Sequence, residues 1–381
     1  MYLKSILKPI FYIAVVWSLS IQVTLAEEEN NWAEDALEYL GSSESIDVAD
    51  GNIDWGVLPG PFSNPEQGFG IGVAVMGLYA PQGENAGNQL STINISGYAS
   101  TAGTYGVGLT NSTYLNQDSI KLNFTTWISQ TPSQFWGIGR EAAEESSNKT
   151  EHEALYFNAE PSISFQFAPN FYFLTGLDYT ILRNQKSNGS SLTKKDLEDK
   201  NNVGLIFGLE YDSRDFIPNP YRGRYVLAEY KTYSKKLSSD YDYQQLTLNY
   251  REFIHVNKSN ILAADFFIQG LSDEDNLPWF AMSKMGGDER MRGYYSGQYR
   301  DRIQASAQLE YRHRFNNRHG IVTWVGAGNI GSKMDELTDT KWLPTYGVGY
   351  RFAFKPRVNV RLDFGFGNEE SAVYFNINEA F

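Results

Sequence analysis

The chain has 381 residues with 45 acidic and 32 basic side chains, and its formal net charge of −13 disfavours nucleic acid as a partner. It contains no cysteine, which excludes disulfides, cysteine-ligated zinc and thiol catalysis. A mean hydropathy of −0.42 is typical of soluble proteins, yet 15% of the residues are aromatic and 34 are glycine. A transmembrane β-barrel combines these properties, because half of every strand faces a polar lumen.

Residues 1–26 have the features of a secretory signal peptide. Lys4 and Lys8 precede an apolar stretch at 10–17, and Ala26 ends a small-residue cleavage site. A membrane anchor is the alternative, but the apolar stretch is shorter than the roughly 20 residues that a spanning helix needs. Cleavage would remove the two lysines and change the net charge from −13 to −15.

Residues 27–64 are predicted to form an acidic N-terminal segment in the periplasm. Trp32, Ala36 and Leu40 recur at helical spacing, and Gly41 would end a short amphipathic helix there. Most of the segment is expected to be disordered because it is acidic and short of apolar residues.

From residue 65 to the end, strand-like segments follow one another and predict a single β-barrel domain at 65–381. Their length suits a tilted crossing of the hydrocarbon layer, which takes about 9 to 11 residues. The strands are expected near residues 68–80, 90–101, 103–115, 118–130, 154–167, 170–182, 203–213, 224–234, 241–254, 259–270, 301–314, 320–329, 345–355, 357–367 and 371–381.

Strict alternation separates two faces in the C-terminal strands. In 301–314, Leu309 and Tyr311 fall on one face while Glu310 and Arg312 fall on the other, and Tyr346 and Phe354 are expected to share an apolar face in 345–355. A soluble sandwich would bury the apolar face, and periodicity alone does not separate the two folds. Repeated charges at alternate positions favour a barrel with a water-filled lumen over a sandwich. The charged residues expected to face the lumen are Glu210, Asp212, Arg214, Glu310, Arg312, Arg351, Arg361 and Asp363. Aromatic girdles at the membrane interfaces are expected from Tyr79, Tyr98, Trp127, Trp136, Trp324 and Trp342.

An even number of strands is required if both ends of the mature chain lie in the periplasm. Fifteen strands are recognised above, and the segment 134–141 (QFWGIGRE) is predicted to be the missing one. The fold class is therefore an all-β, antiparallel transmembrane barrel of about 16 strands. Long connections at 142–153, 183–201, 271–300 and 330–344 would lie outside the cell, and short turns would lie inside.

Four stretches resemble one family of barrels. MRGYYSGQYRDR (291–302) followed by AQLEYRHRF (307–315) resembles the sixth extracellular loop and next strand of the BamA/TamA superfamily of outer-membrane assembly and translocation barrels, or bacterial surface antigens. YDSRDFIPNPYRGRY (211–225) resembles the periplasmic turn before their second eight strands. NPEQGFGIG (64–72) resembles the start of a short subgroup without N-terminal POTRA domains, and AVYFNINEAF (372–381) resembles their C-terminal assembly signal.

The resemblance implies an extracellular loop that folds back into the lumen as a latch. Its residues map onto Arg292, Gly293 and Tyr294, with Glu310 as the acidic partner on the wall. A planar, always charged guanidinium held by a carboxylate suits this role. A solvated surface arginine is the alternative. Gly326 stands where the family often carries a further acid, so a weaker or differently seated latch is expected.

Two further sets of residues are predicted, the first from turn chemistry and the second from the resemblance. In the periplasmic turn, Asp215 and Arg222 are expected to pair while Pro220 and Gly223 shape the backbone. The C-terminal assembly signal maps onto Tyr374, Phe375, Ile377 and Phe381.

An enzyme is not expected, and neither is a cofactor or a metal. The chain has four histidines, and only His152, between Glu151 and Glu153, has a metal-like setting; a solvated acidic loop is the plainer interpretation. The resemblance implies a non-enzymatic barrel that inserts or moves protein or lipid through a loop-plugged lumen and a lateral seam, here between the glycine-rich strand expected at 68–80 and the last strand. A passive pore or structural surface protein is the alternative.

The expected location is the outer membrane of a Gram-negative bacterium. The expected partners are outer-membrane lipid and lipopolysaccharide, the barrel-assembly machinery for the protein's own insertion, and a periplasmic partner through residues 27–64.

Overall fold

The computed structural model describes residues 32–64, 68–83, 86–272, 277–368 and 370–381, which divide into a unit ending at Ser42 and a unit from Ser43 to Phe381. The predicted signal peptide lies outside the described residues. In the first unit, the expected short helix is present as α2 (Trp32–Tyr39). Gly41 ends it with φ 92° and donates its N–H to the Glu38 carbonyl at 2.8 Å, as a glycine C-cap does. No helix of the described residues is long and apolar enough to cross a membrane.

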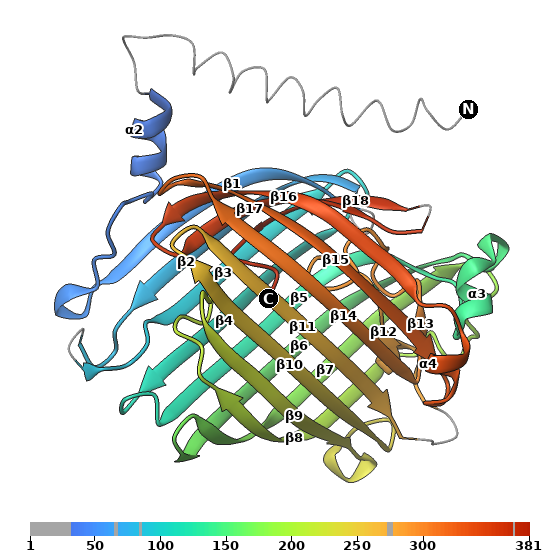
Figure 1. Ribbon diagram of the computed structural model, residues 1–381. Helices are drawn as coiled ribbons and strands as arrows, with labels where there is room; N and C mark the ends of the chain where they lie inside the picture. Colours follow the sequence, from blue (N-terminus) through green and yellow to red (C-terminus); the bar gives the residue numbers. More distant parts are fainter. Residues whose placement is uncertain (1–31, 65–67, 84–85, 273–276, 369) are drawn as a thin grey trace. The chain divides into compact units, whose positions relative to one another are not determined.

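The second unit is a barrel of sixteen antiparallel strands, in which each strand pairs with the next along the chain (Figure 1). This confirms the predicted fold class. The strands are β1 (Ile53–Asn64), β2 (Gly68–Tyr79), β3 (Ser91–Ser100), β4 (Tyr105–Leu115), β5 (Ile120–Phe135), β6 (Thr150–Ala168), β7 (Phe171–Asn188), β8 (Lys200–Asp212), β9 (Gly223–Tyr233), β10 (Tyr243–Asn257), β11 (Asn260–Leu271), β14 (Ile303–Arg314), β15 (His319–Gly331), β16 (Leu343–Lys355), β17 (Val358–Phe366) and β18 (Ser371–Ile377).

Short elements lie in the connections. The long connection between β11 and β14 carries a two-stranded sheet of β12 (Ser283–Lys284) and β13 (Arg300–Asp301). The remaining short helices are η1 (Ala49–Gly51), α3 (Arg140–Glu144), η3 (Ser146–Asn148), η4 (Lys235–Leu237), η5 (Trp279–Ala281) and α4 (Glu336–Asp339). The connections 136–149, 189–199 and 332–342 and the one between β11 and β14 share one end of the barrel, which we call the loop end. The opposite end, which we call the turn end, carries the turns 116–119, 169–170, 258–259, 315–318 and 356–357 together with two longer connections, between β2 and β3 and between β8 and β9.

The sixteenth strand is β1 and not the segment that the sequence suggested. β1 pairs with β2 along its whole length, so the barrel begins at Ile53, within residues first assigned to the acidic N-terminal segment. The segment 134–141 instead ends β5 and then enters α3. β1 is hard to recognise because Pro59 and Pro61 have no N–H for a ladder and are typical of turns. They are tolerated because β1 is the first strand of the sheet order, where a proline costs little.

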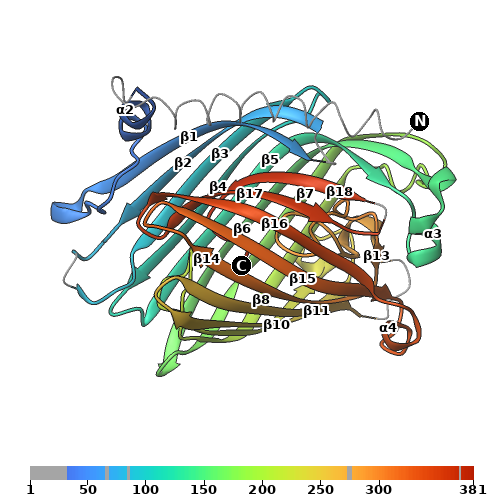
Figure 2. The ribbon, with the colours of Figure 1, turned by 45° about the horizontal axis from the view of Figure 1, so that its top comes forward.

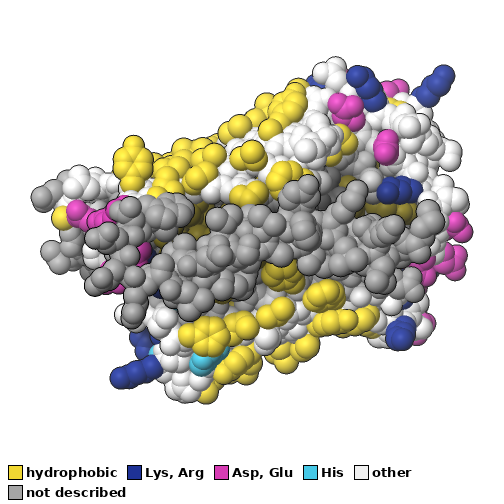
Figure 3. Space-filling model, turned by 90° about the horizontal axis from the view of Figure 1, so that it is seen from above, with side chains coloured by type: hydrophobic (Ala, Val, Ile, Leu, Met, Phe, Trp, Pro, Cys, Tyr) yellow, Lys and Arg dark blue, Asp and Glu magenta, His cyan; other side chains and the backbone are white. Residues whose placement is uncertain are grey.

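The alternation of side chains divides the wall as expected. In β14, Leu309 and Tyr311 are exposed on the outside, whereas Glu310 and Arg312 are buried inside. Figure 3 shows hydrophobic side chains over the outer wall, with charged side chains toward its ends. One expected position is wrong: a β-bulge between Ala353 and Lys355 shifts the register, so Phe354 is buried rather than on the outer face.

The predicted aromatic girdles are wrong in several places. Trp324 and Trp136 are buried, and Tyr98 stacks on Trp127 against an internal cavity. Trp324 pairs with Glu310 in the β14–β15 ladder. Because residues that face one another across a ladder lie on the same side of the sheet, the tryptophan has to point inward with the glutamate.

The last residues of the chain leave the sheet and turn into the barrel. β18 ends at Ile377, four residues earlier than expected, and the end of the chain lies within the ring of strands in Figures 1 and 2. Phe381 is buried against Phe253 and Ala263, and its carbonyl accepts a hydrogen bond from Arg312 at 2.9 Å.

Candidate functional site

The connection between β11 and β14 folds into the barrel, where Arg292 and Gly293 contact the end of β17. Met291 (φ 51°) and Gly293 (φ 112°) make the tight turn at its tip. A Cβ on Gly293 would lie 2.7 Å from the carbonyl carbon of Phe366, and one on Gly365 would lie 2.7 Å from that of Arg292. Glycine on both sides therefore permits an approach that no other residue allows.

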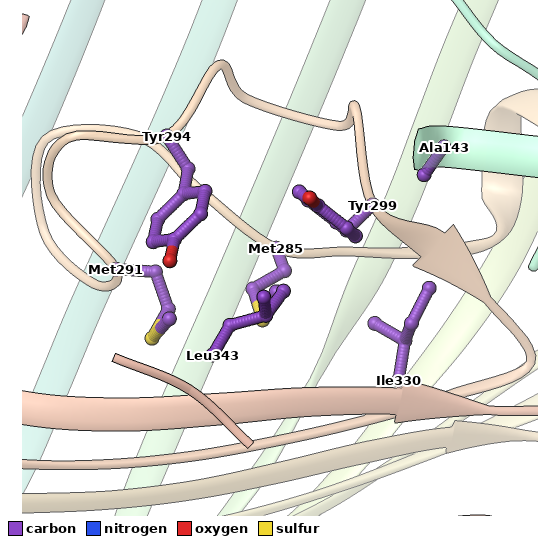
Figure 4. Close-up of a cluster of buried hydrophobic side chains, with 7 residues drawn as sticks. All are labelled: Ala143, Met285, Met291, Tyr294, Tyr299, Ile330 and Leu343. Carbon is purple, nitrogen blue, oxygen red and sulfur yellow. The ribbon is translucent and has the colours of Figure 1, made fainter. Parts of the chain in front are cut away.

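A cluster of buried apolar side chains anchors this loop (Figure 4). Met285, Met291, Tyr294 and Tyr299 of the loop pack against residues of α3, β15 and β16, namely Ala143, Ile330 and Leu343. The Tyr294 hydroxyl donates to the Pro344 carbonyl at 2.7 Å and accepts from the Asn368 N–H at 2.8 Å. The loop is thus seated by packing and by hydrogen bonds on both sides of its tip.

Arg292 is fully buried and has two carboxylate partners. Its Nη2 donates to Glu310 at 2.6 Å, its Nη1 donates to Asp363 at 2.8 Å, and the guanidinium lies 3.6 Å from the centre of the Trp324 ring. The planar guanidinium can satisfy two acids in its plane and an aromatic face above it at the same time, which lysine cannot. The structure therefore brings Arg292 and Glu310 together.

Asp363 is the partner that sequence reasoning missed. The alternation of β17 placed it inside the barrel, but nothing in the sequence pairs a particular inward acid with the loop. Gly326 stands where the family often carries a further acid. A Cβ at this position would lie 2.6 Å from the Ala307 carbonyl oxygen, so a side chain does not fit there without a shift. The second carboxylate comes instead from β17, and Thr345 adds a hydrogen bond to the Arg292 carbonyl at 2.6 Å.

The arginine belongs to a larger network of buried charges. Arg312 donates to Glu310 at 2.8 Å, while Arg351 at 2.5 Å and Arg361 at 3.0 Å donate to Asp363. Arg351 also pairs with Glu379 of the C-terminal segment, and Arg361 pairs with Asp288 of the loop. Four arginines thus face four carboxylates, and removing one member leaves a buried charge without its partner.

The turn before β9 is built differently from the prediction. Asp215 pairs with both terminal nitrogens of Arg357 at 3.0 Å and accepts the Tyr221 N–H at 3.0 Å, whereas the Arg222 side chain is exposed and contributes its backbone N–H. Burial alone would raise the pKa of Asp215, but Arg357 lowers it below its usual value.

Backbone geometry explains the other two residues of that turn. Gly223 has φ 110°, and a Cβ there would lie 2.2 Å from the Ser213 carbonyl oxygen, so glycine is required. Pro220 is buried. Gly223 therefore has the backbone role expected for a glycine in a turn.

The residues of the predicted C-terminal signal do not all lie together. The Tyr374 hydroxyl accepts the Gly293 N–H at 3.1 Å, and Ile377 packs on the cluster around Leu78. The ring of Phe375 occupies the space beside Gly60, and Phe381 lies in the lumen. Tyr374, Phe375 and Ile377 line one cavity beside β1, whereas Phe381 packs in the lumen against Phe253.

The first and last strands make a seam without a described ladder. β1 and β18 end the sheet order, and no pairing joins them among the described residues. A Cβ on Gly60 of β1 would lie 2.6 Å from the Phe375 ring of β18, so the strands are in contact. A cavity of about 420 Å³ lies at the seam and reaches Gly287, Asp288 and Ser296 of the loop.

Comparisons with known proteins agree with this architecture. A family profile described as "Omp85 superfamily domain" matches residues 85–381. BamA from Haemophilus ducreyi lacking POTRA domains 1–3 superposes with a TM-score of 0.53 at 14% identity, over 94% of this chain and 81% of that one. CdiB from Acinetobacter baumannii gives a TM-score of 0.55 at 12% identity, over 84% of this chain and 58% of that one.

CdiB from Escherichia coli gives a TM-score of 0.58 at 11% identity, over 85% of this chain and 62% of that one. The chain therefore spans less than two thirds of either CdiB protein. At these identities the likeness concerns the fold alone, and no curated protein matches in sequence. The profile match covers most of the chain and confirms the resemblance expected from its motifs: the chain belongs to the Omp85 superfamily.

Proposed function

We propose that the protein is a non-enzymatic barrel of the Gram-negative outer membrane that inserts or moves protein or lipid through the seam between β1 and β18. The observation that carries this proposal is the absence of a described ladder at the seam, while every other neighbouring pair in the sheet is hydrogen-bonded. Separating β1 from β18 therefore breaks far fewer hydrogen bonds than opening the wall anywhere else.

The composition of the seam supports opening there. β1 contributes Pro59 and Pro61, which have no N–H to donate, and β18 has seven residues against twelve in β1. Gly60, Gly72 and Gly97 line the cavity at the seam, and the absence of a side chain at Gly60 makes room for the Phe375 ring. The seam is thus a short, weakly bonded contact held mainly by side-chain packing.

The lumen is proposed to be closed by the loop, with Arg292 as the latch. The arginine connects the loop to β14 through Glu310 and to β17 through Asp363, and the C-terminal segment fills the neighbouring space. This arrangement supports the assembly or translocation function over a passive pore, because the loop and the C-terminal segment would obstruct conduction through the lumen.

The outer wall would contact outer-membrane lipid and lipopolysaccharide, and barrel-assembly machinery would insert the protein. The segment before β1 carries exposed acidic side chains, including Glu34, Glu38 and Glu44, that suit a periplasmic partner.

A crosslink across the seam tests the proposal. The chain has no cysteine, so Gly60→Cys with Phe375→Cys gives a single pair at the seam, to be joined by a short thiol-reactive crosslinker. The matched control is Val57→Cys with Val75→Cys, which are already partners in the β1–β2 ladder.

The readouts are insertion of an unfolded barrel protein and lipid exchange between leaflets, both in vesicles containing the purified protein. We expect the seam crosslink to stop the activity and the control crosslink to leave it unchanged. Full activity with a closed seam would refute the proposal.

A further inference from the structure

An internal cavity of about 610 Å³ lies between the inward-folded loop and the loop-end half of the wall. Aromatic rings and neutral hydrogen-bonding groups make up most of its lining. The rings include Tyr98, Trp127, Tyr233, Tyr243 and Trp279, and the amides include Asn202, Gln245, Gln269 and Gln304. Such a combination suits a small ligand with flat apolar faces and many hydroxyl groups.

Two cations of the loop meet at this cavity without an acidic partner. Lys284 and Arg300 are directly opposite in the β12–β13 ladder, and both line the cavity. Like charges opposite one another destabilise a strand pair. Neither makes an ion pair with a carboxylate among the described residues, whereas Arg290 and Arg292 of the same loop have carboxylates at 2.6 Å.

The hydrogen-bond donors of Arg300 and Trp279 beside this cavity are only partly paired with acceptors. Arg300 donates from Nε to the Gly297 carbonyl at 2.9 Å and from Nη1 to the Trp279 carbonyl at 3.3 Å, and its Nη2 has no partner among the described residues. The indole Nε1 of Trp279 is buried and has no hydrogen-bond partner in the described part of the chain. A buried donor without an acceptor costs free energy, which a ligand would recover.

The electrostatic setting favours an anion. Desolvation inside the barrel and the neighbouring Arg300 lower the pKa of Lys284 to about 8 while its side chain stays exposed to the lumen, and burial lowers the pKa of Arg300 to about 10. Asp178 is the acid of the described lining, and it already accepts from Lys231 at 3.2 Å and Tyr233 at 2.9 Å. An incoming anion would therefore meet two cations and one neutralised carboxylate.

We propose that this cavity binds a phosphorylated saccharide, with the phosphate on Lys284, Arg300 and Trp279 and the sugar on the aromatic lining. Two adjacent cations match the charge and the several acceptor oxygens of a phosphate group. The half-buried stacked pair Tyr98–Trp127 offers a flat face for a sugar ring, and the surrounding amides both donate to and accept from hydroxyls. An acidic peptide would pair with the two cations, but its carboxylate side chains have no hydroxyl groups to match the donors and acceptors of the surrounding amide side chains. This site does not depend on the proposed opening of the seam.

The ligand has two routes of supply. Tyr98, Trp127 and Ser296 line both this cavity and the cavity at the seam, so the two spaces adjoin. The same phosphorylated saccharide can therefore come from solution or as the headgroup of a glycolipid in the membrane beside the seam.

Calorimetric titration of the purified protein in detergent tests the site. The probes are glucose 6-phosphate, glucose, inorganic phosphate and tetraglutamate, and a second arm uses monophosphoryl lipid A in nanodiscs. We expect glucose 6-phosphate or monophosphoryl lipid A to bind more tightly than glucose, phosphate or tetraglutamate. Binding of glucose 6-phosphate points to a soluble ligand, and binding of monophosphoryl lipid A alone points to a lipid headgroup. Either result supports the site only if the binding depends on Lys284.

Variants make that dependence explicit. Lys284→Gln is expected to weaken binding about tenfold or more, because it removes a charge-assisted hydrogen bond. Trp279→Phe, which keeps the packing and removes the indole donor, is expected to weaken it less. Lys333→Gln removes an exposed lysine of the loop end and should leave binding unchanged.

Three results would overturn the proposal: no binding of either phosphorylated saccharide at millimolar concentration, equal affinity for inorganic phosphate, or unchanged affinity in Lys284→Gln. Tighter binding of tetraglutamate would assign the cavity to a peptide instead.

Discussion

Arg292 and Asp363 lie 71 residues apart in the chain, yet the guanidinium of one donates to the carboxylate of the other at 2.8 Å inside the barrel. The same carboxylate also accepts from Arg351 and Arg361. Asp363 therefore accepts hydrogen bonds from three buried arginines, more than any other acid of this network. Through Arg292 it also joins the loop to the wall.

Replacing this acid should destabilise the barrel strongly. Asp363→Asn keeps the volume and removes the charge, so three buried arginines lose a partner, and we expect a loss of about 3 to 5 kcal/mol in the free energy of unfolding. Urea unfolding in lipid vesicles, followed by tryptophan fluorescence, measures it. Asp335→Asn, at an exposed position of the loop end, is the matched control and should change little. A loss below about 1 kcal/mol would contradict the role given to Asp363.

Removing the latch should open the lumen. In planar bilayers we expect the unmodified protein to be mostly closed and Arg292→Ala to show frequent, long openings, because the loop loses both carboxylate contacts and its contact with Trp324. Arg292→Lys should be intermediate, since an ammonium group cannot reproduce the planar pair of hydrogen bonds. Arg224→Ala, at an exposed ion pair near the turn end, is the control. A steady open channel in the unmodified protein would instead favour the passive pore.

The backbone contact beneath the latch gives an independent test. In Gly365→Ala the added methyl group would lie 2.7 Å from the Arg292 carbonyl carbon and 2.8 Å from the Gly293 nitrogen, so the loop has to move away from β17. We expect a cost of about 1 to 3 kcal/mol in stability and more frequent openings in bilayers. Gly270→Ala is the matched control, because its nearest neighbour would lie at an ordinary 3.6 Å. Identical behaviour of the two variants would show that the loop is not seated as described.

The sequence predicted correctly which side chains of β14 face inward, because that follows from local alternation. It missed strand β1, because recognising that strand requires the topology of the sheet. The faces of β14 followed from its own residues, so the inward direction of Glu310 was predicted correctly. β1 was missed because Pro59 and Pro61 are typical of turns, and their tolerance depends on a place at the edge of the sheet that only the closed fold defines.

Pairings between distant elements were also beyond local reasoning. Asp215 was expected to pair within its own turn, but that turn meets Arg357 between β16 and β17, 142 residues away. Asp363 was recognised as inward without being recognised as a partner of Arg292. Both contacts depend on how the barrel closes, which no local pattern encodes.

The affinity for glucose 6-phosphate should depend on pH. Lys284 binds an anion only when protonated, so affinity is expected to fall as the pH rises through about 8, and to fall again below about 6 as the phosphate loses its second charge. Calorimetry between pH 5 and 9.5 measures it, and Lys284→Gln should remove the decline at high pH. The other titratable groups that face the cavity are Tyr98, His152, Tyr156, Asp178, Tyr233, Tyr243 and Arg300. If the decline in affinity at high pH persists in Lys284→Gln, one of these groups causes it.

The buried end of the chain predicts that a C-terminal tag is harmful. Phe381 packs inside the barrel against Phe253, and its carbonyl is held by Arg312, so a hexahistidine extension would have to displace the ring or be buried with it. We expect a lower yield of folded barrel, measured by the shift in mobility on gels between unheated and heated samples. Phe381→Ala should cost about 3 to 5 kcal/mol in stability through the cavity it leaves. The same tag inserted after Lys236, in an exposed connection at the loop end, is the control and should be tolerated. Equal folding of the two tagged proteins would show that the last residues are free to leave the lumen, and that the contacts of Phe381 add little to the stability of the barrel.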